Sequence, residues 1–196
     1  MDKIKKLRLK RKFLMLRLYL SAFLGKMGYE RADMIRKSGL FHQVGKNVYF
    51  HPYKIPTEPM GVSLGDNVVV CTGVEFITHD VSHRMLNNNP RYNAGGGGTS
   101  FNYLMDKIEV GDNVLIGAFT TIRYGVKIGT NCVIASGSMI IKDVPDNCVV
   151  GGNPAKIICS TDEFVEKRKQ KQDMMPQWSN GDKEDYYRRL WGQENI

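Results

Sequence analysis

The chain of 196 residues has an ordinary apolar fraction of 42%, which allows a continuous buried core and argues against disorder throughout. Its net charge of +8 is confined to residues 1–40, which hold 12 basic and 3 acidic residues, whereas residues 41–196 hold 16 and 17. This distribution argues against a basic groove across the main part of the chain, and no nucleic-acid partner is expected. Four widely spaced cysteines without a C-x-x-C pair argue against a disulfide framework or a zinc site.

Residues 1–40 are expected to form a basic amphipathic helical segment. Basic and apolar residues alternate over 3–27 without proline, which predicts a helix continuing toward Ser38-Gly39. The apolar run 13–24 follows cationic residues as in a signal peptide, but Arg17 interrupts it and it is too short to span a bilayer. A cytoplasmic location is therefore expected. Two roles stay open for the helix: a cap on the following domain, or a peripheral contact with the inner membrane face.

A period of six residues dominates residues 41–158. Large apolar residues recur at this step at Val110, Ile116, Ile122, Ile128, Ile134 and Ile140, and Leu64, Val70 and Phe76 form an earlier block. Six residues fit neither the 3.6-residue period of an α-helix nor a series of hairpins. The period predicts an all-β solenoid in which each hexad is one strand and turn, and three hexads make one triangular coil.

Residues 80–106 interrupt the six-residue period. The stretches 87–90 (Asn-Asn-Asn-Pro) and 95–98 (four glycines) predict a long inserted loop, and long loops in compact domains are often functional. Residues 159–196 follow the last hexads. Their charged, helix-compatible stretches at 163–171 and 183–191 predict a C-terminal helical extension.

The hexads, the segment Ile77-Thr78-His79-Asp80 and the closing runs 140–145 and 151–156 resemble the hexapeptide-repeat acyltransferases. The likeness is to the sugar and capsular polysaccharide O-acetyltransferases in particular, and it covers roughly residues 44–158. It implies a left-handed parallel β-helix and a homotrimer with active sites between subunits. It also implies transfer of acetyl from acetyl-CoA, as co-substrate and without a required metal, to a hydroxyl of a sugar or polysaccharide precursor.

This transfer needs a base with a pKa near neutrality, which is the range of histidine. His79 stands where the repeat ends and the insertion begins, the position of the catalytic histidine in the family, and is the predicted general base. His42 and His51 precede the regular coils and are expected to be structural, and the role of His83 stays open. Asp80 could orient the imidazole of His79 or cap a turn.

The remaining predicted site residues follow from the same resemblance. Asp80, Arg84 and Tyr103, within the insertion, are candidates for binding the acceptor. Gly117, Ala118 and Ser136 match positions where small residues let the pantetheine arm of acetyl-CoA approach the backbone. Lys142 and Lys156 match cationic positions near the nucleotide phosphates, where a point charge is useful.

Other functions stay open on the sequence alone. N-acetylation of an antibiotic or an amino sugar would use the same coils and histidine, and only acceptor contacts within 80–106 would distinguish it. Carbonic anhydrases of the γ type share the implied fold but need three histidine ligands, and no third histidine falls within a hexad. A non-catalytic scaffold recruited to the membrane by the N-terminal helix would need neither His79 nor acetyl-CoA.

Overall fold

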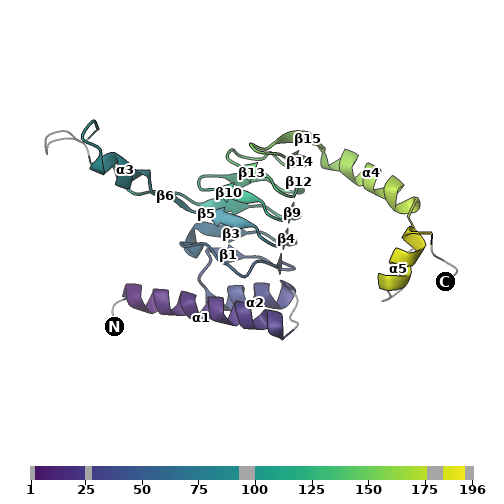
Figure 1. Cartoon of the computed structure of the whole chain (residues 1–196), viewed down its shortest axis with the longest axis horizontal. Coiled ribbons are helices and arrows are strands. Elements are labelled where there is room, and N and C mark those ends of the chain that lie inside the picture. The colour runs from purple at the N-terminus through teal and green to yellow at the C-terminus, as the bar shows by residue number, and fades with distance from the viewer. Residues whose placement is uncertain (1–2, 25–27, 93–99, 176–182, 193–196) are drawn as a thin grey trace.

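The computed structural model describes residues 3–24, 28–92, 100–175 and 183–192. A three-sided coil of short parallel strands forms its centre (Figure 1). The first sheet contains β1 (Gln43–Val44), β3 (Val62–Leu64), β8 (Ile108–Val110) and β11 (Lys127–Ile128). The second contains β2 (Tyr49–Phe50), β4 (Val68–Val70), β9 (Val114–Ile116), β12 (Cys132–Ile134) and β14 (Cys148–Gly151). The third contains β5 (Glu75–Ile77), β10 (Thr121–Arg123) and β13 (Met139–Ile140). Successive strands visit the three sheets in turn, so each sheet is one side of a solenoid.

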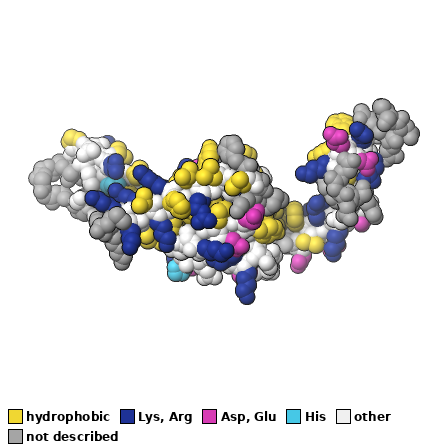
Figure 2. Space-filling model, turned by 90° about the horizontal axis from the view of Figure 1, so that it is seen from below, with side chains coloured by type: hydrophobic (Ala, Val, Ile, Leu, Met, Phe, Trp, Pro, Cys, Tyr) yellow, Lys and Arg dark blue, Asp and Glu magenta, His cyan; other side chains and the backbone are white. Residues whose placement is uncertain are grey.

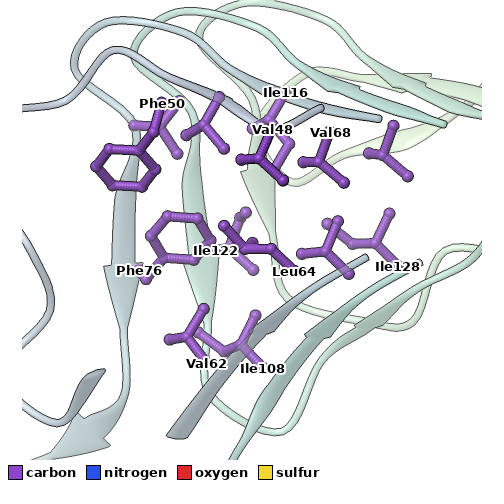
Figure 3. Packing of buried hydrophobic residues seen from close by; sticks show 14 of the residues in the cluster. Val48, Phe50, Val62, Leu64, Val68, Phe76, Ile108, Ile116, Ile122 and Ile128 are labelled. Carbon is purple, nitrogen blue, oxygen red and sulfur yellow. The ribbon is translucent and has the colours of Figure 1, made fainter. Parts of the chain in front are cut away.

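Residues that pair between neighbouring coils are three hexads apart in the sequence. In the second sheet, Ile116 pairs with Ile134, and in the third sheet Ile122 pairs with Ile140. Figure 3 shows buried apolar side chains from successive strands facing one another inside the coil. All six residues of the main repeat are at most 4% exposed. The predicted stacking of apolar columns is confirmed at these positions.

Asparagines turn the corner between the first and second sheets. Residues 47, 67, 113, 131 and 147 are all asparagine with φ between 53° and 59°. Their side-chain amides form a ladder, with Asn113 joined to Asn67 at 2.9 Å and to Asn131 at 3.0 Å. Asparagine tolerates this left-handed conformation better than most residues because its short polar side chain bonds locally. The ladder thus stabilises a corner that the hexad pattern did not predict.

The insertion contains regular structure in addition to the expected loop. α3 (Ser82–Asn88) follows its first residues, and β6 (His79–Asp80) pairs with β7 (Leu104–Met105) in an antiparallel ladder. This ladder brings the two ends of the insertion together, and the chain resumes the coil at β8, in register with β3. Residues 93–99, including the four glycines, lie outside the described residues.

Two helices stand where the sequence predicted one. α1 (Lys3–Phe23) and α2 (Gly28–Ser38) lie side by side across the end of the solenoid next to β1, as Figure 1 shows, and residues 25–27 lie outside the described part. Leu14 and Leu18 of α1 are buried in the same apolar core as Val48 and Phe50. The inward side of α1 therefore covers the last apolar layer of the coil, as a solenoid cap must.

The other end of the solenoid is closed differently. β15 (Lys156–Ser160) pairs antiparallel with β14, and Ser160 caps α4 (Thr161–Asp173) by accepting a hydrogen bond from the backbone N–H of Glu163. α5 (Lys183–Leu190) follows, and the α4–α5 arm extends from the coil on the side opposite α3 (Figure 1). In the described part of the chain, no helix is both long enough and apolar enough to cross a bilayer.

Candidate active site

His79 lies at the neck where the insertion leaves the solenoid. The chain completes β5 at Ile77, and the backbone of His79 then pairs with Met105 on the returning strand. Two strands from opposite ends of the insertion therefore fix the main chain at the histidine. The side chain is 24% exposed, which leaves the imidazole partly open to solvent.

A carboxylate absent from the predicted site contacts the imidazole. Oε2 of Glu58 lies 2.8 Å from Nδ1 of His79, and the same oxygen accepts a hydrogen bond of 2.5 Å from Oγ1 of Thr78. Glu58 precedes a short 3₁₀ turn, η1 (Pro59–Gly61), which leads into β3. Because η1 and the end of β5 belong to the same coil, residues 20 positions apart converge at one corner.

The charge state of Glu58 follows from its surroundings. Burial alone would raise its pKa, but hydrogen bonds from Thr78 and His79, and the positive charges of His79 and Arg11, together lower the pKa below its usual value. Glu58 is therefore ionised at neutral pH. An ionised carboxylate only accepts hydrogen bonds, so the facing Nδ1 of His79 carries the proton. When the imidazole is neutral, the lone pair therefore lies on Nε2, the other ring nitrogen.

Tyr103 covers one face of the imidazole. Its ring stacks on His79 with centroids 5.0 Å apart and an interplanar angle of 30°, and it meets His83 edge-on at 5.3 Å. Burial, followed by the nearby negative charge of Glu58, raises the pKa of Tyr103, while the charge of Arg84 acts in the opposite direction. Of the predicted residues, Tyr103 thus lies against the histidine, and Arg84 in α3 is near enough for its charge to act on Tyr103.

Asp80 is near His79 in sequence but bonds elsewhere. Its Oδ1 accepts a hydrogen bond of 2.5 Å from the backbone N–H of Ser82, which forms a turn at the start of α3. These bonds to Ser82 lower the pKa of Asp80. Of the two roles left open by the sequence, the geometry favours the turn, and Glu58 occupies the orienting position.

A pocket of 140 Å³ opens beside His79. Arg11 from α1, Lys54, and Glu75 and Ile77 from β5 contribute to its walls. A larger groove of 430 Å³ lies between α1 and α2, but it contains none of the predicted site residues. The smaller pocket is therefore the better candidate for an acceptor site, because it holds the one histidine with an ionised carboxylate partner among the described residues.

The predicted donor residues fall mainly on another corner of the coil. Gly117 and Ala118 lie between β9 and β10, Ser136 lies one coil further between β12 and β13, and Lys156 begins the final strand above them. Hydrogen bonds join these turns, with Gly137 N–H donating to the carbonyl of Ala118 at 2.8 Å. All of them lie along the corner between the second and third sheets.

Gly117 has a structural reason for being glycine. A Cβ at this position would lie 2.5 Å from the backbone nitrogen of Ser136 in the next coil. The close approach of the coils therefore requires glycine whether or not a ligand binds. At Gly137, by contrast, a Cβ would meet no atom within 4 Å, so the outer side of this corner is open.

Lys142 lies apart from the other donor residues. It follows β13, at the corner between the third and first sheets, which is the corner where His79 stands after β5. One chain thus places His79 and the Gly117–Ser136 corner on opposite edges of the third sheet. A strand of three residues is roughly 10 Å long, so the two edges of the third sheet are about that far apart. The turns at both ends increase this distance.

Comparisons with known proteins agree with this architecture. The family described as "Bacterial transferase hexapeptide (six repeats)" matches residues 107–142, and "Hexapeptide repeat of succinyl-transferase" matches residues 44–76. Protein CapG of Staphylococcus aureus is 34% identical over 144 residues, which cover 69% of this chain and 74% of that protein. Galactoside O-acetyltransferase of Escherichia coli K12 is 34% identical over 117 residues, 59% of this chain and 52% of that protein.

Solved structures share the fold. The hexapeptide-repeat-containing acetyltransferase VCA0836 of Vibrio cholerae O1 biovar eltor, complexed with acetyl-CoA, has a TM-score of 0.58 and 25% identity, covering 82% of this chain and 90% of that one. The chain belongs to the hexapeptide-repeat acetyltransferase family. It spans between 52% and 65% of the length of three of the curated relatives that it matches.

A metal centre finds no support in the geometry. Among the described residues, no group of three or more His, Cys, Asp or Glu side chains is arranged to hold an ion. The γ carbonic anhydrase alternative requires three histidine ligands. His79 instead faces Glu58 and Tyr103, so its surroundings favour proton transfer.

Proposed function

We propose that this protein is an acetyl-CoA-dependent O-acetyltransferase that acylates a hydroxyl of a sugar or polysaccharide precursor, with His79 as general base. The contact between Glu58 and His79 carries the proposal, because the carboxylate fixes which ring nitrogen of His79 carries the proton beside a pocket. The relatives named as acetyltransferases support the acetyl donor, and galactoside O-acetyltransferase supports a sugar acceptor. A cytoplasmic location, expected from the free thiols, belongs to the same proposal.

The protein's own groups account for the proton transfer. Nε2 of His79 would accept the proton of the acceptor hydroxyl as the oxygen attacks the acetyl carbonyl carbon. The imidazolium that forms is stabilised by the carboxylate of Glu58 on its other side. When the carbon–sulfur bond breaks, the same proton would pass to the leaving thiolate. His79 then returns to its neutral form.

Acetyl-CoA would supply an activated acetyl group as a thioester. We assign its binding to Gly117, Ala118 and Ser136, whose corner presents backbone groups and open space at Gly137. Lys156 at this corner would meet the phosphates, and Lys142, which lies at the His79 corner, would do so from a neighbouring copy. Asp80, Arg84 and Tyr103 are proposed acceptor contacts, because Tyr103 stacks on His79 and the other two belong to the strand and helix that lead away from it.

The separation of the two corners favours a site shared between subunits. The donor corner of one chain and His79 of the same chain face different directions along the third sheet, so a neighbouring copy must bring them together. We therefore propose a homotrimer of left-handed coils, the arrangement that the family resemblance implies. Light scattering on the purified protein would give a mass three times that of one 22.2 kDa chain.

Thermal unfolding with and without acetyl-CoA tests the donor without knowledge of the acceptor. At about a hundred times its dissociation constant, a ligand stabilises the fold by roughly 2.7 kcal/mol, which gives a readily measured rise in Tm. AMP serves as the control. No rise at high acetyl-CoA, with the oligomer intact, would favour the non-catalytic scaffold instead.

Transfer assays then distinguish the acceptors. Release of free thiol from acetyl-CoA is measured with neutral sugars, amino sugars and an aminoglycoside. An alkali-labile product indicates an ester and supports O-acetylation. An alkali-stable amide would show N-acetylation, the alternative that uses the same histidine.

Mixed oligomers test the shared site. A His79→Ala chain and a Ser136→Trp chain, each inactive alone, are co-expressed with different affinity tags. Recovery of activity in the doubly tagged fraction is expected, because some interfaces would combine an intact His79 with an intact donor corner. No recovery in mixed oligomers would contradict the intersubunit site.

A further inference from the structure

The outward side of α1 carries an exposed apolar stripe, one residue of which, Phe13, also lines the groove between α1 and α2. Leu9, Phe13, Leu16 and Leu20 are spaced four, three and four residues apart, which places them on one face of a helix. Each is more than half exposed. The buried residues of α1, Leu14, Leu18 and Ser21, lie on the opposite side.

Cationic residues flank this stripe on both sides. The helical repeat places Lys6, Lys10 and Arg17 along one flank, and Lys5, Arg8 and Lys12 along the other. α1 contains no acidic residue, although Glu30 and Asp33 of α2 line the groove that Lys10 and Arg17 also line. The flank of Lys5, Arg8 and Lys12 lies away from that groove. Figure 2, which views the molecule from below, shows hydrophobic side chains interspersed with lysine and arginine on this face. The long basic side chains can therefore reach past the apolar stripe to anionic groups at its level.

The position of α1 leaves this face accessible to a flat surface. α1 and α2 lie below the coil in Figure 1. Arg11, toward the inward side of the same helix, lines the pocket beside His79. A surface that binds the stripe would thus lie beneath the solenoid, with the candidate acceptor pocket close above it.

We propose that α1 binds in the plane of an anionic lipid bilayer, with the stripe Leu9, Phe13, Leu16 and Leu20 in the acyl boundary and the flanking cations at the headgroups. Charge decides between this occupant and a second copy of the chain. A symmetric contact between two stripes would place like-charged flanks beside each other, whereas a bilayer rich in anionic lipid meets both flanks with opposite charge. The proposal is independent of the acetyl-transfer reaction.

Co-sedimentation of the full chain with vesicles tests the proposal. One set contains phosphatidylcholine alone and the other about one third phosphatidylglycerol, at low and high salt. Strong binding to the anionic set, weak binding to the neutral set and a loss at high salt are expected. Equal binding to both sets, or none to the anionic set, would overturn the proposal.

A double variant tests the apolar stripe. Phe13→Ser with Leu16→Ser should weaken vesicle binding at least about tenfold, because two large side chains no longer enter the acyl boundary. The matched control is Val165→Ser with Met174→Ser, which also removes exposed apolar side chains but at α4 and its C-terminal end. Circular dichroism verifies folding of both. If the stripe variant binds vesicles normally but loses oligomer mass, the face serves contacts between copies and the proposal fails.

A second pair of variants tests the charges. Replacing Lys5, Lys6 and Lys12 with Gln should weaken binding to anionic vesicles at least about tenfold, since each cation near the surface contributes about fivefold. The control replaces Lys167, Lys169 and Lys171 of α4 with Gln, which removes the same charge elsewhere. An equal loss in both variants would indicate a nonspecific effect of net charge and contradict a specific α1 surface.

Discussion

Glu58 and His79 meet at 2.8 Å although 21 positions separate them in the chain. Glu58 stands before the first strand of its coil, and His79 stands after the third, so one full turn of the solenoid returns the chain to the same corner. The carboxylate fixes the protonated nitrogen of the imidazole and leaves the other nitrogen to act as base. Three of the predictions below follow from this relationship.

The variant His79→Ala should retain binding of acetyl-CoA and lose transfer by at least about a hundredfold, because a general base typically contributes that much. Thermal shift measures the first property and release of free thiol measures the second. His42→Ala serves as the control histidine. Turnover close to that of the unaltered protein would remove His79 from the proposed role.

Glu58→Gln should lower kcat by about tenfold to a hundredfold with little change in the KM for acetyl-CoA, since the residue acts through His79. Glu58→Asp should recover part of the activity if its shorter carboxylate still reaches Nδ1. Glu109→Gln provides the control, because Glu109 contacts Nζ of Lys107 at the same distance of 2.8 Å but lies on β8. If Glu58 were purely structural, Glu58→Gln would lower Tm without lowering kcat selectively relative to KM.

The pH dependence of stability should report the same carboxylate. The folded pKa of Glu58 lies below its ordinary value of 4.5, so its ionised form stabilises the folded state above that pH. This stabilisation is lost as the pH falls below 4.5 and through the lowered pKa. The Tm difference between the unaltered protein and Glu58→Gln should be steady from neutrality down to pH 4.5 and shrink below it. A difference that grows on acidification would contradict the direction of the shift.

Gly117→Ala should destabilise the fold by about 1–3 kcal/mol even without ligand, because the added methyl group meets backbone of the next coil. Gly61→Ala is the matched control: its Cβ would find its nearest neighbour at 3.7 Å, and the expected change is within about 0.5 kcal/mol. Thermal unfolding compares the two. An unchanged Tm for Gly117→Ala, together with weaker acetyl-CoA binding, would show that the ligand alone requires this glycine.

The asparagine ladder can be separated into its two contributions at position 113. Asn113→Ala should cost about 1–2 kcal/mol, since alanine is strained at a φ of 56° and forms no amide bonds. Asn113→Gly should cost less, because glycine adopts this φ freely and only the ladder is lost. Equal losses in denaturant unfolding would assign the whole effect to the hydrogen bonds.

The apolar repeat is sufficient to predict the coil. Residues at six-residue steps must face one interior if three strands make one turn, so Ile116 and Ile134 are expected to stack, and they pair in register. The candidate base His79 was predicted from the family resemblance, which places the catalytic histidine where the repeat stops and the insertion begins. The sequence did not predict the break between α1 and α2, or the helix α3 within the insertion. These segments lie outside the six-residue repeat, so its spacing gives no information about them.

The sequence by itself determined the solenoid and its apolar columns, since these depend on spacing along the chain, and the family resemblance pointed to His79 as the candidate base. Tertiary structure decided which carboxylate contacts the histidine. Asp80 is its neighbour in sequence, but its oxygen bonds the turn before α3, and Glu58 reaches the imidazole from elsewhere in the coil. Tertiary structure also separated His79 from the Gly117–Ser136 corner and turned the stripe of α1 outward. These three features depend on which parts of the folded chain lie next to one another. A local sequence pattern does not contain that information.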